Sequence, residues 1–212
     1  MSNKNGIYKE FNGPMIKTIE ELVSEKRIPI NISNLMVRRL EFGNSERDFY
    51  IDNTFDSVDA VIYHPSSRVK IAIDLNINEI IEKKKITALD GALILNEDLY
   101  SSIKGREFEL KNLRKENHIG TLLKKEEARQ NPIWNILARD IYLLNNYTEF
   151  VFSEIKKRFS SDVGMKVNLD LFYYDNLIKM KVWTLGNFFS KSAVFGNLSL
   201  SSPFGRLIGK RQ

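Results

Sequence analysis

The sequence predicts a mixed α/β fold built on a mixed sheet, with a long buried helix and a C-terminal antiparallel hairpin. Three observations carry this prediction: helical periodicity in residues 14–27 and 131–159, alternating apolar residues in several short segments, and the order helix, three strands, helix, strand in the first half. An α+β arrangement is the alternative. A chain of 212 residues with 42% hydrophobic and 28% charged residues is long enough for one large core or two small ones.

The first half supplies a helix and three strands. Residues 14–27 begin with a proline and place apolar residues on one face, which predicts an amphipathic helix, and residues 32–42 fit a second, short helix. Residues 48–52, 58–64 and 68–75 are rich in apolar and aromatic residues and predict three strands. A Pro-Ser-Ser turn joins the last two strands, so we expect them to pair as a hairpin.

The next elements complete the first half. Residues 78–85 predict a helix, residues 91–95 a short buried strand, and residues 96–104 a helix capped by its first asparagine. The whole of residues 1–105 is therefore predicted to form one α/β core. Residues 106–130 are strongly charged and predict a partly helical connector.

The last part, residues 131–212, begins with the longest predicted helix. Residues 131–159 open with an asparagine cap and a proline, and their apolar residues cover most of the circumference, so we expect this helix to be buried. Residues 164–174 and 176–185 alternate cleanly and predict a β-hairpin. Residues 192–212 allow one more strand and a basic tail. We expect this part to pack on the first core.

Two aspartates on the predicted hairpin are the candidate chemical site. Asp59 and Asp74 lie on neighbouring strands, and carboxylates that converge there can bind a hard cation such as Mg²⁺, which takes oxygen ligands. Glu20 or Glu21 on the first helix can supply a third oxygen. The alternative is that both aspartates are ordinary carboxylates at strand ends.

The order of elements and the two aspartates resemble the core of the PD-(D/E)xK nuclease-like superfamily, over residues 14–96. The resemblance implies that Asp59 and Asp74 bind Mg²⁺ and activate water for phosphodiester cleavage, with Glu20 as the helix carboxylate. Asn76 stands where the superfamily has a lysine. Because an amide lacks the charge that stabilises the transition state, we expect weak or no nuclease activity unless a lysine of residues 83–85 replaces it.

The charge distribution indicates an anionic partner. The formal net charge is +5, and residues 151–212 carry ten Lys/Arg against four Asp/Glu. One face of the predicted hairpin mixes lysines with aromatic residues, a combination that binds phosphates and stacks on bases. The predicted nucleic-acid-binding residues are Lys166, Lys179, Lys181, Phe172, Trp183, Arg206, Lys210 and Arg211. The same face can instead bury its aromatic residues in the core, or form a protein interface.

The sequence thus predicts a nucleic-acid-binding protein, for DNA or RNA, on a nuclease-like core. The alternative is a non-catalytic interaction subunit of a homo-oligomer or of a ribonucleoprotein or defence assembly with a protein partner. The absence of cysteine excludes disulfides and thiolate metal sites. No apolar run has the length of a membrane span, so we expect a soluble, cytoplasmic protein without a membrane partner.

Overall fold

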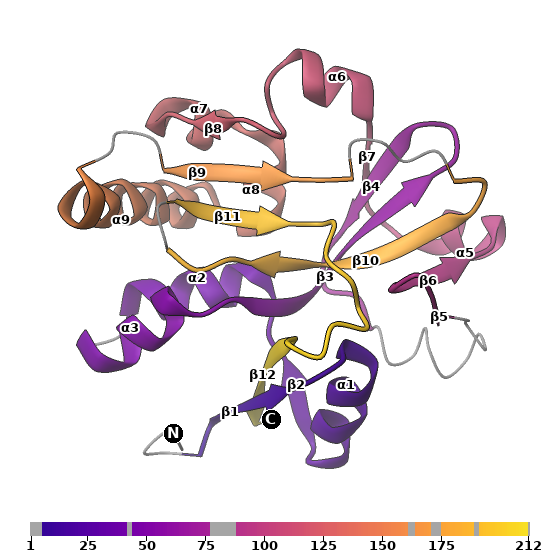
Figure 1. Cartoon of the computed structure of the whole chain (residues 1–212), viewed down its shortest axis with the longest axis horizontal. Coiled ribbons are helices and arrows are strands. Elements are labelled where there is room, and N and C mark those ends of the chain that lie inside the picture. Colours follow the sequence, from indigo (N-terminus) through magenta and orange to yellow (C-terminus); the bar gives the residue numbers. More distant parts are fainter. Residues whose placement is uncertain are drawn as a thin grey trace.

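The computed structural model of the chain has a mixed sheet with helices on both sides (Figure 1). It describes residues 6–41, 44–76, 88–160, 164–170, 175–188 and 191–211. The predicted mixed α/β class is confirmed. Within the described residues, every helix is too short or too polar to cross a membrane.

Twelve strands of the described residues form one sheet. Its main path runs in the order β1 (Tyr8–Asn12), β12 (Arg206–Arg211), β3 (Phe55–His64), β10 (Ile178–Leu185), β11 (Ser192–Phe195), β9 (Met165–Asn168) and β8 (Leu122–Leu123). Five strands branch from this path: β2 (Arg27–Pro29), β4 (Arg68–Ala72), β5 (Ala88–Leu89), β6 (Ala92–Leu95) and β7 (Arg106–Glu109). The long strands β3 and β10 pair along most of their length. Strand β4 pairs with β3, and strand β6 pairs with β10.

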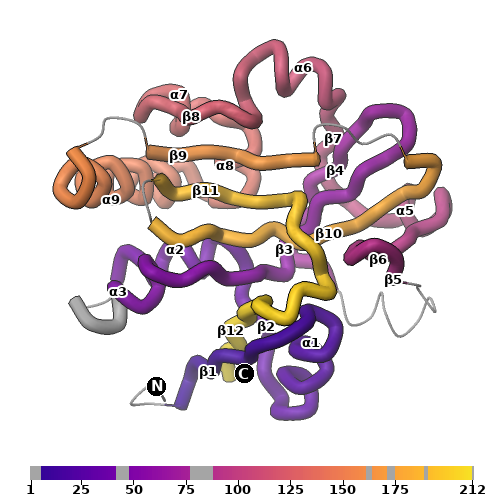
Figure 2. Tube along the Cα trace, in the orientation of Figure 1, coloured from indigo at the N-terminus to yellow at the C-terminus, as the bar shows by residue number. Residues whose placement is uncertain are grey.

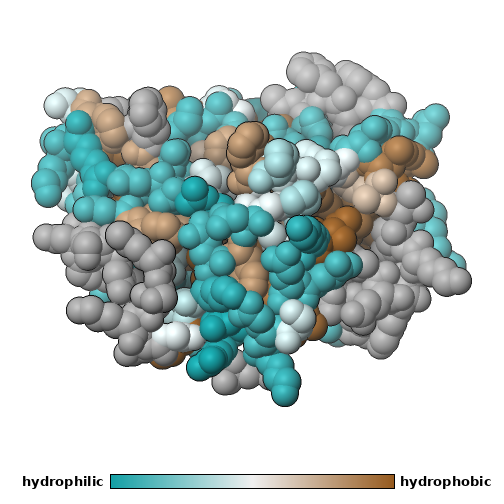
Figure 3. Space-filling view, turned by 60° about the horizontal axis from the view of Figure 1, so that its bottom comes forward, coloured by the Kyte–Doolittle hydropathy of each residue, from teal (hydrophilic) through white to brown (hydrophobic). Residues whose placement is uncertain are grey.

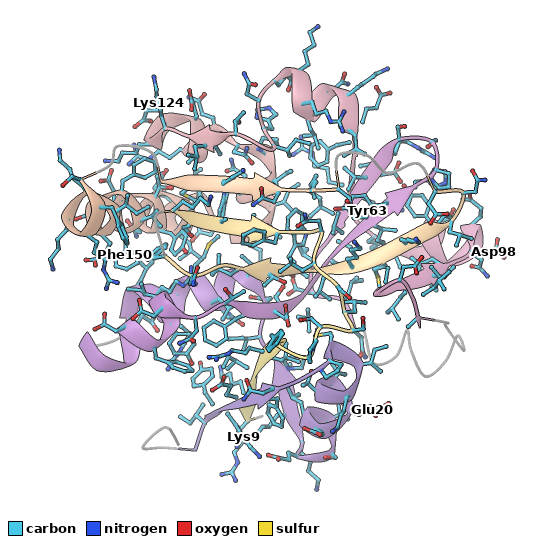
Figure 4. The ribbon with its side chains drawn as sticks, viewed as in Figure 1. Lys9, Glu20, Tyr63, Asp98, Lys124 and Phe150 are labelled. Carbon is cyan, nitrogen blue, oxygen red and sulfur yellow. The ribbon has the colours of Figure 1, made fainter. Side chains whose placement is uncertain are left out.

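Helices cover both faces of the sheet, so β3 buries side chains on both of its faces. Val61 and Tyr63 point into one core cluster, with residues of α2 (Ile32–Glu41), α3 (Asn44–Asp52), α8 (Pro132–Ala138) and α9 (Ile141–Phe159). Ala60 and Ile62 point into the other, with α1 (Met15–Ser24) and α5 (Glu97–Ser102). This is the period of two that a strand buried on both faces requires. Figure 4 shows Tyr63 near the centre of the molecule.

Several predicted elements are confirmed. The segments 14–27 and 32–42 contain α1 and α2, and 91–95 and 96–104 contain β6 and α5. Strands β3 and β4 pair as the predicted antiparallel hairpin. The helix predicted at residues 78–85 lies outside the described residues. Two short helices, α6 (Leu110–Lys115) and α7 (Lys125–Gln130), form within the predicted connector together with β7 and β8.

The strand predicted at residues 48–52 is wrong, because these residues belong to α3. Tyr50 and Ile51 are both buried in the core cluster that contains residues of α2, α3, α8 and α9. In a strand, consecutive residues would instead point to opposite faces. The backbone carbonyl of Tyr50 accepts a hydrogen bond of 2.8 Å from the Nε of Arg39, which ties α3 to α2.

The single helix predicted at residues 131–159 is two helices. Asn131 caps α8 as predicted, accepting hydrogen bonds from the N–H groups of Ile133 and Trp134. The break comes at Arg139, whose backbone has the left-handed φ of 64°. Asp140 then caps α9 by accepting from the N–H of Tyr142. An aspartate competes well for a helix start, so the chain turns here instead of continuing.

The C-terminal hairpin is also wrong. Strand β9 pairs in parallel with β11, while β10 pairs with β3, β6 and β11. Nearly every residue of β10 is buried, so it occupies the centre of the sheet with partners on both sides. The alternating pattern identified both strands, but their pairing depends on β11, which follows later in the chain.

The two ends of the described chain meet. Strand β1 pairs antiparallel with β12, from Tyr8 opposite Lys210 to Asn12 opposite Arg206. Figure 2 shows β1 and β12 together at the bottom of the molecule, near α1. Strand β12 also contacts β3, so strands of the predicted segments 1–105 and 131–212 share one sheet.

Candidate functional site

Asp59 is a fully buried residue of β3, and its side chain lies at the start of α2. Its carboxylate accepts a hydrogen bond of 2.9 Å from the N–H of Ile32, the first residue of α2. It also accepts two bonds from the Arg139 guanidinium, at 3.2 Å from Nη1 and 2.5 Å from Nη2. Strand β3 therefore connects to α2 and to the α8–α9 junction through one carboxylate.

Asp74 lies beside Asp59, brought there by a backbone turn. Ala60 faces Ala72 in the ladder, so regular pairing would place residue 73 opposite Asp59. The chain leaves the strand instead, and Asp74 has a left-handed φ of 56°. Its N–H donates to Asp59, 3.2 Å away, and its carboxylate accepts from Arg139 Nη2 at 2.8 Å. The two carboxylates converge on an arginine.

The Asp59–Arg139–Asp74 cluster does not fit a bound Mg²⁺. Partial burial opposes the ionisation of Asp74, but the hydrogen bonds and charge of Arg139 and the amide of Asn31 hold its pKa below the ordinary value. All oxygens of the two carboxylates already accept hydrogen bonds. Across the described residues, no group of three or more His, Cys, Asp or Glu side chains is arranged to hold a metal ion.

The other predicted catalytic residues are Glu20 and Asn76. Glu20 is exposed on α1, at the bottom of Figure 4, and Asn76 is exposed in the segment after β4. Arg139 was missed because its partners are distant in the sequence. A signal for it exists, since Arg139-Asp140 is a charged pair inside an otherwise apolar helical pattern.

The predicted lysine and aromatic face does not form as one surface. Lys179 is nearly buried and pairs with Asp175 at 2.5 Å, which, against some desolvation, raises the pKa of Lys179. Lys181 pairs with Asp170 at 3.0 Å. Trp183 is fully buried in the core cluster that contains residues of α2, α3, α8 and α9. Phe172 lies outside the described residues.

The remaining predicted basic residues are spread over two strands. Lys166 is half-buried on β9. Arg206 donates to Asn53 at 2.6 Å and pairs with Glu10 at 3.3 Å, while Lys210 and Arg211 are exposed at the end of β12. Figure 3 shows that the face turned forward from the bottom of Figure 1 is largely hydrophilic, with apolar residues in separate patches.

Asp56 is the second carboxylate on β3, and its burial raises its pKa although Thr184 and the N–H of Arg206 donate to it. A raised pKa means that the ionised form destabilises the folded state, so stability falls as pH rises from about 4 through that pKa. An Asp56→Asn variant keeps both hydrogen bonds, because the Thr184 hydroxyl can accept as well as donate. We expect this variant to be as stable as the wild type, or more stable, at pH 7.

The advantage of Asp56→Asn should shrink toward pH 4, and urea unfolding between pH 4 and pH 8 measures it. A growing advantage on the acid side would contradict the raised pKa.

Two adjoining cavities lie at the top of Figure 1, among β7, α6, β8 and the α7–α8 junction. The larger, of about 550 Å³, follows β7 and is called the β7 cavity. The smaller, of about 400 Å³, is called the β8 cavity. Glu116, His118 and Gln130 line both, so the two form one hollow. Volumes of this size are typical of ligand sites.

All four residues of β7 line the β7 cavity. Glu107 pairs with Arg68 at 3.1 Å and with the buried Lys70 at 3.3 Å. Although desolvation opposes it, these partners and Tyr100 lower the pKa of Glu107, so its carboxylate stays ionised near neutral pH. Phe108 also lines this cavity.

The β8 cavity combines apolar and acidic walls. Leu122 and Leu123 form one part, and Glu116 and Glu127 line another. Glu116 pairs with His118 at 3.0 Å, and Glu127 accepts from the backbone N–H of Lys124 at 2.8 Å. The Lys124 group that donates to Glu127 is its backbone amide and not its charged ammonium.

Much of the hollow lies in residues 106–130, which the sequence predicts to be a connector, so no site was expected there. The alternation of charged and apolar residues in residues 106–110 was a signal for β7. No pattern in the sequence indicated which other segments would face that strand.

Comparisons with known proteins give one clear finding. No family model matches the sequence, and no curated protein is similar enough to match it. A solved structure from Nanoarchaeota, described as the accommodation of massive sequence variation by the C-type lectin fold, superimposes with a TM-score of 0.70. The alignment covers 96% of this chain and 97% of that one, at 13% identity. The chain has a C-type lectin fold.

The C-type lectin fold corrects the predicted nuclease-like core. The paired ends β1 and β12 and the helical residues 48–52 differ from the predicted order of helix, three strands, helix and strand. Asp59 and Asp74 hold Arg139 where the nuclease prediction placed Mg²⁺.

The prediction of a nucleic-acid-binding protein on that core is wrong with it. Of the residues predicted to bind nucleic acid, Lys179 and Lys181 pair with aspartates and Trp183 lies in the core. These local contacts account for part of the basic and aromatic pattern that suggested nucleic acid.

Proposed function

We propose that this chain is a recognition domain that binds a lysine- or arginine-bearing segment of a partner protein in the hollow. The observation that carries the proposal is the β8 cavity, where two leucines and two glutamates line one space of about 400 Å³. A protein partner was one of the sequence-based expectations, and the lining of the hollow supports it.

The chemistry of the β8 cavity suits a long basic side chain. Lysine and arginine bury their aliphatic stems against apolar surface and keep their charged ends among polar groups. In the β8 cavity the stem would pack on Leu122 and Leu123, and the charge would lie near Glu116 and Glu127. Gln130 and Thr121 line the same cavity and offer further hydrogen bonds.

The C-type lectin fold is compatible with this function but does not by itself imply it. Its neighbour from Nanoarchaeota is described as accommodating massive sequence variation. In this chain the hollow is built from short elements and turns at the border of one core cluster, to which Leu113 and Leu123 belong. Binding residues commonly occupy such segments on a rigid scaffold.

The peptide acetyl-KVKVKV-amide tests the proposal. We expect it to bind the wild-type protein, measured by isothermal titration calorimetry, and acetyl-EVEVEV-amide not to bind. Replacing Glu116 and Glu127 together by glutamine should weaken binding of the lysine peptide by roughly two- to thirtyfold, since exposed ion pairs contribute about 0.2–1 kcal/mol each.

Net charge needs its own control, because the chain already carries +5. The double replacement of Glu20 and Glu21 by glutamine makes the same change in net charge on α1, away from the hollow. This variant should bind like the wild type. Equal losses in both double variants, or no binding of the lysine peptide to the wild type, would contradict the proposed function.

A further inference from the structure

Strand β7 has an open edge beside the β7 cavity. Among the described residues it pairs with β4 alone, and the segment is exposed along most of its length. The other strand that borders the hollow, β8, has only two residues and pairs with β9. An unpaired edge presents backbone N–H and C=O groups in a row, which is the template that another strand can extend.

The hydrogen-bond phase of the ladder shows which groups of β7 are free. Glu109 faces Arg68, and the next pair along is Leu110 with Ser67, where the N–H of Leu110 donates to the carbonyl of Ser67 at 3.0 Å. In an antiparallel pair, bonded and non-bonded positions alternate. Phe108 and Arg106 therefore also bond to β4, and the backbone groups of Glu107 and Glu109 point to the open edge.

Three backbone groups are available there. They are the N–H and C=O of Glu107 and the N–H of Glu109, because Glu109 is the N-cap of α6 and its carbonyl belongs to the helix. No hydrogen-bond partner of these three groups lies within the described part of the chain.

We infer that the partner segment adds to β7 as a further strand, antiparallel to it, with alternating basic and apolar residues. This inference rests on the proposed function and gives its binding mode. The cavity of about 550 Å³ supplies space along all four residues of β7. Main-chain hydrogen bonds would give the affinity, and the side chains on each face the specificity.

The alternation follows from the two faces of β7. Glu107 and Glu109 project on one face, and the residues of the added strand directly opposite them share that face. Glu107 pairs there with Arg68 and Lys70, and Glu109 pairs with Lys111, so a basic residue of the added strand would extend these ion pairs. Phe108 projects on the other face and packs against the core cluster that contains residues of α2, α3, α8 and α9. The residues of the added strand that alternate with the basic ones lie on this face, so we expect them to be apolar. In antiparallel pairing, the basic residues also direct their own N–H and C=O groups toward β7.

N-methylation of the peptide tests this geometry without changing its charge. We compare acetyl-KVKVKV-amide with two forms of the same peptide, one methylated on the backbone nitrogen of every lysine and the other on that of every valine. The first should bind at least about tenfold more weakly, because it loses the hydrogen bond to the Glu107 carbonyl and gains methyl groups at the edge. The second should bind like the unmodified peptide.

Amide hydrogen exchange, measured by NMR on the full chain with saturating unmodified peptide, gives the second readout. The amides of Glu107 and Glu109 should become protected, whereas those of Arg106 and Phe108, already bonded to β4, should change little.

The outcomes separate the binding mode from the proposed function. Equal effects of the two methylations, or unprotected Glu107 and Glu109 amides in a saturated complex, would overturn strand addition and leave recognition of a basic segment standing. Failure of the unmodified peptide to bind would overturn both. A loss in the lysine-methylated form together with new protection at Glu107 and Glu109 establishes the added strand.

Discussion

An Asp59→Ala variant is expected to lose about 3–5 kcal/mol of its free energy of unfolding. The substitution leaves the Arg139 guanidinium without the carboxylate that accepts two of its hydrogen bonds, and leaves the first N–H of α2 without its acceptor. Removal of one member of a buried ion pair costs more than the pair contributes, because the other charge stays desolvated. Urea unfolding at pH 7 measures the loss.

Asp74→Ala is the matched control. It removes the other carboxylate of the same arginine, but the Asp74 side chain is 59% exposed, so water screens its interaction. We expect a loss of no more than about 1 kcal/mol. Similar losses in the two variants would show that burial of Asp59 contributes little, and that the cluster is an ordinary surface network.

The local elements of this fold could be predicted from the sequence because their signals are local. Period-two alternation identified β3 and β4 and the turn between them, and the cap at Asn131 placed the start of α8. The break at Arg139 was missed because nineteen residues of α9 continue a strongly apolar pattern. The αL conformation of Arg139 is held by carboxylates from β3 and from beyond β4, which a helical pattern does not show.

Long-range pairing accounts for the larger errors. The order of helices and strands in the first half is shared by unrelated folds, and the closure of β1 on β12 joins segments nearly two hundred residues apart. Asp59 and Asp74 were correctly singled out as neighbours, yet the group between them comes from the α8–α9 junction. The hollow has the same origin, since β7 and the α7–α8 junction meet only in the folded chain.

Trp183 shows how one misplaced pairing changes the role of a residue. In the predicted hairpin its ring was placed on an open face, but β10 is central and both of its faces are covered. A Cβ atom added at Gly196 would lie 3.2 Å from the Trp183 ring, so backbone and ring are already in close contact. Such packing leaves no room for a base or any other ligand.

A Trp183→Ala variant should therefore lose about 3–5 kcal/mol of its free energy of unfolding, from lost apolar burial and the cavity that remains. Trp183→Phe keeps most of the ring volume and should lose clearly less. Urea unfolding gives both values, and the fraction that stays folded should bind acetyl-KVKVKV-amide with wild-type affinity, because Trp183 does not line the hollow. A loss below about 1 kcal/mol for Trp183→Ala would mean that the ring is solvated and that β10 is not covered on both faces.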